Sequence, residues 1–135
     1  MTTGYSGTPL RRKLGVTPDQ TTWRLAMPDA IATEIDADAP PILLPAPVPG
    51  LMSAHVFATE RAVMADALAR LRQLLAPTGM VWLSWPKRAS KVPTDITEDV
   101  IRAVALPIGY VDVKVCAVDA IWSGLKLVIR VSQRG

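Results

Sequence analysis

The hydrophobic pattern changes its period repeatedly after Gly50, and this alternation constrains the fold more than any other feature of the sequence. Strand-like apolar runs cover residues 52–58 and 80–85, and a helical pattern lies between them. That pattern is carried by Met64, Leu68, Leu71 and Leu75, and Thr59 before it is expected to be the N-cap. A second helical pattern begins after Asp95, which resembles an N-cap with Glu98 three residues later. The order from residue 52 to 131 is therefore strand, helix, strand, helix and a final pair of strands.

The final two strands are expected over about 110–118 and 124–131. The joint between them, Asp119 to Ser123, is too short for a crossover helix, so the pair should form an antiparallel hairpin. The earlier strands are separated by helices, which favours parallel pairing through right-handed crossovers. The sequence predicts an α/β fold with three layers and a mostly parallel sheet that ends in a C-terminal antiparallel hairpin.

The first part of the chain is less regular. With 135 residues the chain is expected to be a single domain, in which residues 1–20 are a polar lead-in with a short helix over about 9–14. Residues 21–51 are a reduced, proline-rich first half, with a strand at 21–27 and a short helix at 29–35. The prolines between residues 40 and 49 leave room only for a short edge strand at Ile42, Leu43 and Leu44.

Composition excludes several classes of protein. The net charge of +3 is too weak to indicate nucleic acid, although Trp85 interleaved with basic residues is a pattern that single-strand binders also use. One cysteine, Cys116, cannot form an internal disulfide, and it lies in an apolar run typical of a buried side chain rather than a reactive thiol. No apolar run is long enough to span a membrane, and no signal-peptide core is found, so a cytoplasmic protein is expected.

The element order resembles the C-terminal part of Rossmann-like class I methyltransferases, in which a strand and helix lead to a proline–glycine turn, a strand, a helix and a terminal hairpin. Here the segment 74–82, with Pro77 and Gly79, looks like that turn. The resemblance implies S-adenosylmethionine as cofactor. However, the segment Ala26-Met27-Pro28-Asp29-Ala30 after the first strand has no glycine through which a backbone could approach a cofactor. No cofactor is therefore predicted, and a non-enzymatic role is favoured.

Several motifs resemble those of a bacterial family of small proteins of unknown function. They are Tyr5-Ser6-Gly7-Thr8-Pro9-Leu10 with Lys13-Leu14-Gly15, Trp85-Pro86-Lys87, Thr94-Asp95-Ile96-Thr97-Glu98-Asp99, the segment Val111 to Asp119, and Trp122-Ser123-Gly124-Leu125-Lys126. The sequence is identified as a member of this family on nearly its whole length. The resemblance implies no particular activity.

The loop after the strand at 80–85 is the first candidate site. In open α/β sheets, ligands bind beyond the carboxyl ends of the strands, and a helix N-terminus attracts anions. This loop contributes the cations and hydroxyls of Lys87, Arg88, Ser90, Lys91 and Thr94. They predict a site for a phosphate or carboxylate. The alternative is a capped helix behind a soluble basic loop, because Asp95, Glu98 and Asp99 already occupy the positive helix end.

Two further candidates remain open. Trp122 in the expected hairpin turn, with Lys126 on the return strand, could present an aromatic binding face, or Trp122 could be packed over its own hairpin. The single histidine, His55, lies on a strand without a nominated nucleophile, so a structural histidine is favoured over a general base. With one histidine and one cysteine, no metal site is predicted.

The leading hypothesis is a non-catalytic Rossmann-like domain that binds a protein partner or a small anionic ligand at the edge formed by residues 86–95. The alternative is a methyltransferase-like enzyme with a degenerate S-adenosylmethionine pocket. No membrane partner is expected, nucleic acid is not favoured, and a homo-oligomer is compatible with the sequence.

Overall fold

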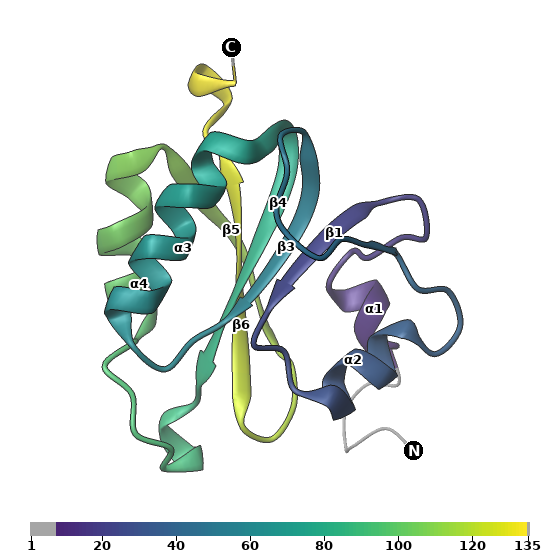
Figure 1. The fold of residues 1–135 in the computed structure, drawn as a ribbon. Helices are drawn as coiled ribbons and strands as arrows, with labels where there is room; N and C mark the ends of the chain where they lie inside the picture. The colour runs from purple at the N-terminus through teal and green to yellow at the C-terminus, as the bar shows by residue number, and fades with distance from the viewer. Residues whose placement is uncertain (1–7, 135) are drawn as a thin grey trace.

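The computed structural model describes residues 8–134, and Tyr5, Ser6 and Gly7 of the first motif lie outside them. Its centre is a six-stranded sheet with the order β2-β1-β3-β4-β6-β5 (Figure 1). The strands are β1 (Thr21–Leu25), β2 (Ile42–Leu43), β3 (Leu51–Phe57), β4 (Leu75–Pro86), β5 (Tyr110–Ala117) and β6 (Trp122–Ile129).

The sheet is parallel on one side and antiparallel on the other. Strands β2, β1, β3 and β4 pair in parallel, whereas β6 runs antiparallel to both β4 and β5. The predicted α/β class and the mostly parallel sheet with a C-terminal hairpin are confirmed.

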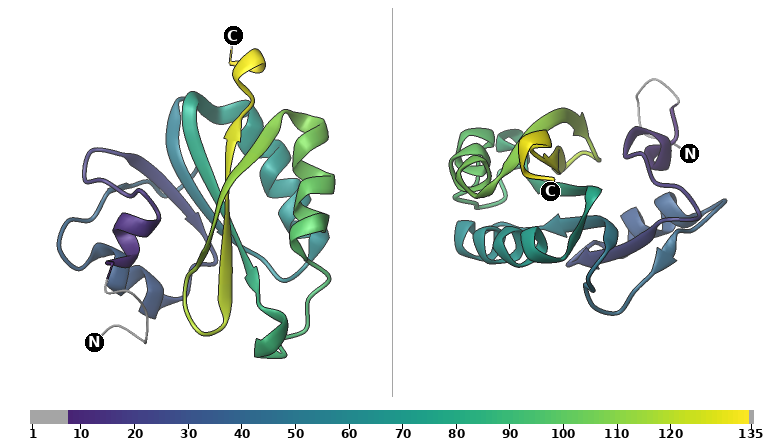
Figure 2. Two further views of the ribbon diagram at one scale, coloured as in Figure 1. Left: turned by 180° about the vertical axis from the view of Figure 1, so that it is seen from behind. Right: turned by 90° about the horizontal axis from the view of Figure 1, so that it is seen from above.

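Helices cover both faces of the sheet, which gives three layers (Figure 2). The α-helices are α1 (Leu10–Lys13), α2 (Asp29–Asp36), α3 (Arg61–Leu74) and α4 (Glu98–Ala105). The short 3-10 helices are η1 (Arg88–Ser90), η2 (Leu106–Ile108) and η3 (Val131–Gln133). None of the helices in residues 8–134 is long and apolar enough to cross a membrane.

The larger core lies between the sheet and helices α3 and α4. Its helix side is formed by residues of α3 such as Met64, Leu68 and Leu71, which recur at helical spacing and are fully buried. Tyr110 at the start of β5 joins this core, and its hydroxyl donates a hydrogen bond of 2.8 Å to the carbonyl of Leu68. That bond satisfies the polar end of a large buried side chain.

The smaller core lies on the opposite face, under α1 and α2. Leu10 and Leu14 from the N-terminal segment and Ile31 and Ile35 from α2 pack against the sheet here. Trp82 of β4 is 1% exposed, and its indole Nε1 donates a hydrogen bond of 2.8 Å to the carbonyl of Leu14. This bond ties α1 to the middle of the sheet.

Two predicted helix caps are wrong. Asp95 does not cap the helix that follows it; Thr97 does, by accepting a hydrogen bond of 3.2 Å from the Val100 N–H. Asp95 instead accepts a bond from the N–H of Arg61 and so caps α3. Thr59, expected as the cap of α3, lies one residue before the observed N-cap, Glu60. Residue spacing in the sequence can indicate a cap only next to its own helix. The cap of α3 is Asp95, which belongs to the distant loop after β4.

The hairpin also differs in detail from the prediction. Trp122 lies in β6 rather than in the turn, because β6 begins there. The turn itself is closed by Asp119, whose carboxylate accepts hydrogen bonds of 2.8 and 2.7 Å from the N–H groups of Ile121 and Trp122. The Trp122 ring packs edge-on against Phe57, with 5.0 Å between ring centroids.

Candidate functional site

The carboxyl ends of β1, β3 and β4 lie along one edge of the sheet, because these strands are parallel. Strand order reverses at β1, which has β2 on one side and β3 on the other. Such a reversal is where open α/β sheets hold their ligands. Three segments at this edge therefore decide what the protein can bind: residues 26–28, residues 58–61 and residues 86–98.

The first segment follows β1. Ala26 has a φ of 57°, in the left-handed region that normally favours glycine. The backbone thus makes a tight turn here, although the glycine expected for a cofactor turn is absent from the sequence. Met27 then folds back to pack against the smaller core, and Pro28 is the N-cap of α2.

The second segment is the N-terminus of α3, which the chain itself covers. Asp95 Oδ1 accepts a hydrogen bond of 2.6 Å from the backbone N–H of Arg61. Beside it, the Thr94 hydroxyl donates a bond of 2.6 Å to the carbonyl of Thr59. A helix N-terminus is an anion site when its N–H groups are free. Here an internal carboxylate takes the place of an external anion.

The third segment forms a pocket of about 490 Å³ at the end of β4. It is lined by Trp85, Pro86, Arg88, Lys91, Val92, Pro93, Thr94, Ile96, Thr97 and Glu98. The size falls within the range of small-molecule sites. The 86–95 loop and the start of α4 therefore form an open pocket rather than only a basic surface.

The charge of this pocket is positive. The side chains of Arg88 and Lys91 are exposed and make no ion pair or hydrogen bond with any described residue. The pocket's carboxylate, Glu98, is already paired with Arg102 at 2.7 Å. Two cations are therefore available to an anion, and the nearby acid is neutralised from outside the pocket.

Lys91 is held in an unusual backbone conformation. Its φ is 61°, and it closes η1 through its own N–H, which bonds the carbonyl of Arg88 at 3.1 Å. A left-handed lysine costs of order 1 kcal/mol relative to an ordinary conformation. The 3-10 turn thus brings Arg88 and Lys91 to the same pocket at a small cost in stability.

Some of the residues predicted at this site have structural partners instead. Lys87 Nζ donates a hydrogen bond of 2.7 Å to the carbonyl of Asp119 and so fixes the loop to the hairpin turn. The Ser90 hydroxyl bonds the carbonyl of Lys87 at 2.6 Å and accepts from Val92. Thr94 lines the pocket, but its hydroxyl is held by Thr59 and by the N–H of Ile96.

The second predicted pair lies elsewhere. Trp122 is half-buried against Phe57, and Lys126 lies opposite Trp82 in the register of β4 and β6. Neither residue lines the pocket at the end of β4. The structure therefore brings together Arg88, Lys91 and Thr94, and it adds Trp85, Ile96 and Glu98, which only the folded loop reveals.

His55 is enclosed in the sheet. It is 4% exposed, and its Nε2 lies 2.7 Å from the Ser84 hydroxyl, which is fully buried. Burial lowers the pKa of His55 to about 3, and the positive charge of Arg24 adds to this effect. Arg24 in turn is held by Asp36 through contacts of 2.8 and 2.7 Å. These facts fit the structural interpretation of His55, which is neutral at physiological pH.

Cys116 has a similar passive environment. It is 9% exposed within the smaller core, and burial raises the pKa of its thiol. A raised pKa leaves the thiol protonated and unreactive near neutral pH. This supports the interpretation of Cys116 as a small buried hydrophobe.

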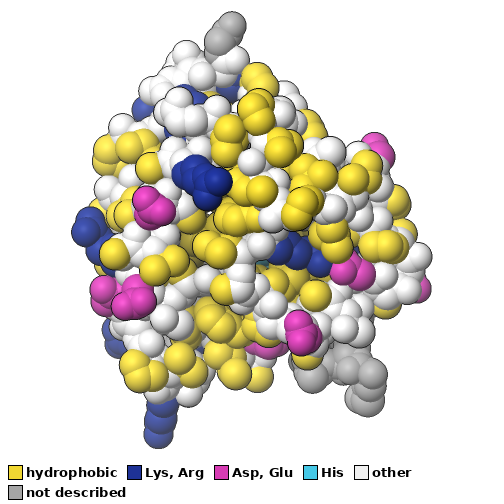
Figure 3. All heavy atoms as spheres, in the orientation of Figure 1, with side chains coloured by type: hydrophobic (Ala, Val, Ile, Leu, Met, Phe, Trp, Pro, Cys, Tyr) yellow, Lys and Arg dark blue, Asp and Glu magenta, His cyan; other side chains and the backbone are white. Residues whose placement is uncertain are grey.

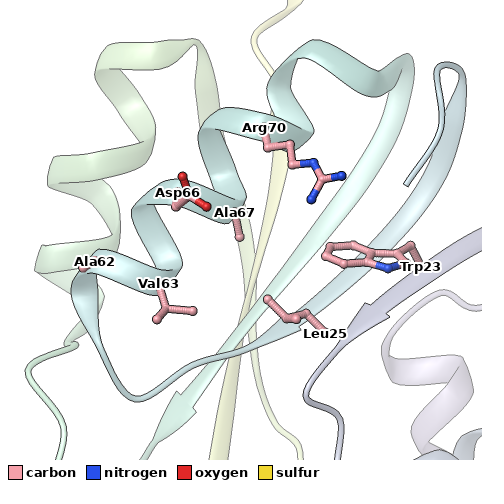
Figure 4. Close-up of a pocket in the computed structure, with 7 residues that line it drawn as sticks. All are labelled: Trp23, Leu25, Ala62, Val63, Asp66, Ala67 and Arg70. Carbon is pink, nitrogen blue, oxygen red and sulfur yellow. The ribbon is translucent and has the colours of Figure 1, made fainter. Parts of the chain in front are cut away.

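A second hollow, of about 440 Å³, was not expected from the sequence (Figure 4). It lies between α3 and β1 and is lined by Trp23, Leu25, Ala62, Val63, Asp66, Ala67 and Arg70. Trp23 is only partly buried and forms part of this lining. The hydrophobicity of Trp23 and Leu25 predicts that they are buried, but it does not show whether a helix covers β1 on this face.

No protein-family model matches the sequence, and no curated protein matches it. Membership in the bacterial family of small proteins therefore stays a prediction.

Solved structures do match. A SAM-dependent methyltransferase from Aquifex aeolicus is 10% identical, with a TM-score of 0.62 over 92% of this chain and 94% of that one. A ribosomal protein L11 methylase from Lactobacillus delbrueckii is 10% identical, with a TM-score of 0.58 over 90% of this chain and 75% of that one. A fibrillarin from Aeropyrum pernix, with natively bound S-adenosyl-L-methionine, is 14% identical, with a TM-score of 0.51 over 93% and 70%. At these identities the likeness concerns the fold, and this chain has the Rossmann-like fold of the S-adenosylmethionine-dependent methyltransferases.

Proposed function

We propose that this protein binds a small anionic ligand in the pocket at the end of β4. The observation that carries the proposal is the pair Arg88 and Lys91, which line this open pocket and whose side chains have no ion-pair or hydrogen-bond partner among residues 8–134. Glu98 does not cancel them, since Arg102 already pairs with it. A charge-assisted hydrogen bond to an anion would satisfy both cations.

The rest of the lining indicates what the ligand's other part is like. Trp85 and Ile96 are buried, and Val92 and the two prolines Pro86 and Pro93 complete an apolar wall. Apolar walls with a few polar groups are typical of sites that enclose organic ligands. The ligand class supported best is a small organic phosphate or carboxylate with a planar apolar body.

A thermal-shift titration tests this proposal. Ligand at 100 times its Kd should raise the free energy of unfolding by about 2.7 kcal/mol, which is a shift of several degrees in Tm. The wild type is compared with Arg88→Gln/Lys91→Gln, which keeps polar side chains at both positions and removes both charges. Lys126→Gln is the matched control, because Lys126 lies outside the pocket.

The expected result is that nucleoside monophosphates or aromatic carboxylates shift the wild type and the control but not the double variant. Equal shifts in the double variant, or none in the wild type with any of these anions, would overturn the proposal.

The second candidate function is methyl transfer with S-adenosylmethionine bound where β1 and β3 end. The comparisons favour this candidate, since structural neighbours are methyltransferases, and the left-handed turn at Ala26 keeps a feature that glycine usually supplies. The residues present fit the cofactor poorly. No glycine follows β1, Met27 packs inward, and Asp95 already occupies the N-terminus of α3.

The same titration separates the two candidates. S-adenosylmethionine and S-adenosylhomocysteine are added to the wild type and to Arg88→Gln/Lys91→Gln. A shift that survives in the double variant supports the second candidate, because it places the ligand away from the pocket at the end of β4.

A further inference from the structure

One corner of the sheet lacks a covering helix. β1 leads into α2, which packs on the opposite face, and β2 leads into the connection 44–50, in which the structure has no helix. Neither strand therefore contributes a helix to the face that carries α3 and α4. Trp23, Leu25 and Leu44 lie on this face and are only partly buried against the larger core. Ile42 of β2 is 49% exposed. The right-hand view of Figure 2 shows α3 and α4 together over one half of the sheet.

The uncovered strands and α3 enclose the hollow above Trp23. Trp23 and Leu25 form its sheet side, and Val63 on α3 is 43% exposed at its border. Figure 3 shows hydrophobic side chains gathered across the middle of this face, with charged groups around them. An exposed apolar surface with charged groups around it is typical of a contact with another protein.

The charges on α3 identify the partner. Asp66 and Arg70 line the hollow one helical turn apart, and both are exposed. Neither makes an ion pair with the other or with any residue of the described chain. In Figure 4 the Arg70 side chain extends toward Trp23, away from Asp66. Asp66 and Arg70 lie on either side of the middle of α3. If a second α3 helix is placed beside the first in the opposite direction, the acid of each helix therefore faces the base of the other.

We propose that this surface, defined by Trp23, Leu25, Val63, Asp66 and Arg70, binds a second copy of the chain. A two-fold axis midway between residues 66 and 70 sets the α3 helices antiparallel. Each Asp66 then faces Arg70 of the other copy, so one contact occurs twice, as an isologous interface requires. Pairing through the β2 edge is disfavoured, because that strand has two residues and prolines flank it.

Light scattering on a sizing column tests the interface in wild type, Asp66→Arg, Arg70→Asp and an equal mixture of these two variants. The wild type should be a dimer at a concentration on the order of 100 µM, where micromolar contacts are populated. Each single variant places like charges together twice and should be monomeric. The mixture should recover a dimer that contains one copy of each variant. In that dimer, position 66 of each copy and position 70 of the other again pair an arginine with an aspartate.

Asp99→Arg on α4 is the control, since Asp99 is 96% exposed, lies outside the proposed surface and should leave the dimer unchanged. Circular dichroism confirms that the exposed substitutions keep the fold. A monomeric wild type overturns the proposal. So does a dimer that survives both charge reversals, or a mixture of the two variants that stays monomeric. This test is independent of the ligand pocket, because neither Asp66 nor Arg70 lines it.

Discussion

Asp95 Oδ1 accepts a hydrogen bond of 2.6 Å from the backbone N–H of Arg61, a residue 34 positions earlier in the chain. This contact joins the loop that follows β4 to the first turn of α3. It places a carboxylate where an open α/β fold would offer free N–H groups to a ligand. It also holds the 86–95 loop against the sheet edge, so that Arg88 and Lys91 border a pocket.

Replacing Asp95 with alanine removes the cap of α3 without touching the core. We expect a loss of about 1 kcal/mol in the free energy of unfolding, as for other N-caps. Urea denaturation measures it. Glu60→Ala is the control, because Glu60 is the N-cap residue but makes no capping hydrogen bond, and it should cost much less. Equal losses in the two variants would contradict the assignment of Asp95 as the cap.

Ala26 offers a test of the turn after β1. Its left-handed φ of 57° costs roughly 1 kcal/mol, which glycine would recover. Glycine also adds about 0.4–1 kcal/mol of entropy to the unfolded chain, so Ala26→Gly should leave stability nearly unchanged. Ala103→Gly on the exposed side of α4 should instead cost about 1 kcal/mol. If denaturant melts show the same loss for both, the turn is not left-handed.

His55 makes stability depend on pH. Its pKa in the folded protein is about 3, because of burial and Arg24, whereas an unfolded histidine titrates near 6.5. The folded state therefore binds fewer protons, so the contribution of His55 is fully present above pH 6.5. It is lost as pH falls toward 3, by up to about 1.4 kcal/mol per pH unit.

The control for this prediction is His55→Gln, which keeps a hydrogen-bonding group near Ser84 but does not titrate. The difference in unfolding free energy between wild type and variant, measured from pH 7 to pH 4, should decrease as the pH is lowered. A difference that stays constant over this range would show that His55 titrates alike in both states.

Lys87 should contribute to stability and not to ligand binding. Its Nζ bonds the carbonyl of Asp119 in a half-buried position, and a bond from a charged donor contributes about 1.5–3 kcal/mol. Lys87→Met should therefore lower Tm, while the shift produced by an anionic ligand stays as in the wild type. Loss of the ligand shift without loss of stability would assign Lys87 to the pocket instead.

The fold was largely predictable from the sequence, because its signals are local. Periodicity placed the helix of Met64 and Leu68 and the apolar strand that contains Trp82, and the short joint after Val118 required a hairpin. The cap of α3 was not predictable, since Asp95 reaches it from a loop far along the chain. The spacing of Asp95 and Glu98, three residues apart, instead indicated a cap for α4.

The candidate site was predictable in place and less so in composition. The sequence indicates the loop of residues 86–95 as a cluster of cations beyond a strand end, and the structure has an open pocket there. Which cations line the pocket depends on the 3-10 turn and the left-handed Lys91. The hollow above Trp23 left no sequence signal, because it arises from a helix that the short 44–50 connection does not provide.

A two-dimensional NMR titration of the tryptophan indole N–H signals gives the sharpest test of anion binding at the end of β4. Trp85 lines the proposed pocket, whereas Trp82 is buried on the other face of the sheet and serves as an internal control. On addition of adenosine monophosphate, benzoate or pyrophosphate, we predict that at least one of them shifts the Trp85 signal and leaves Trp82 unchanged. We also predict that Arg88→Gln/Lys91→Gln abolishes the shift. A Trp85 signal that responds to none of these anions, or that responds equally in the double variant, would contradict the proposed site.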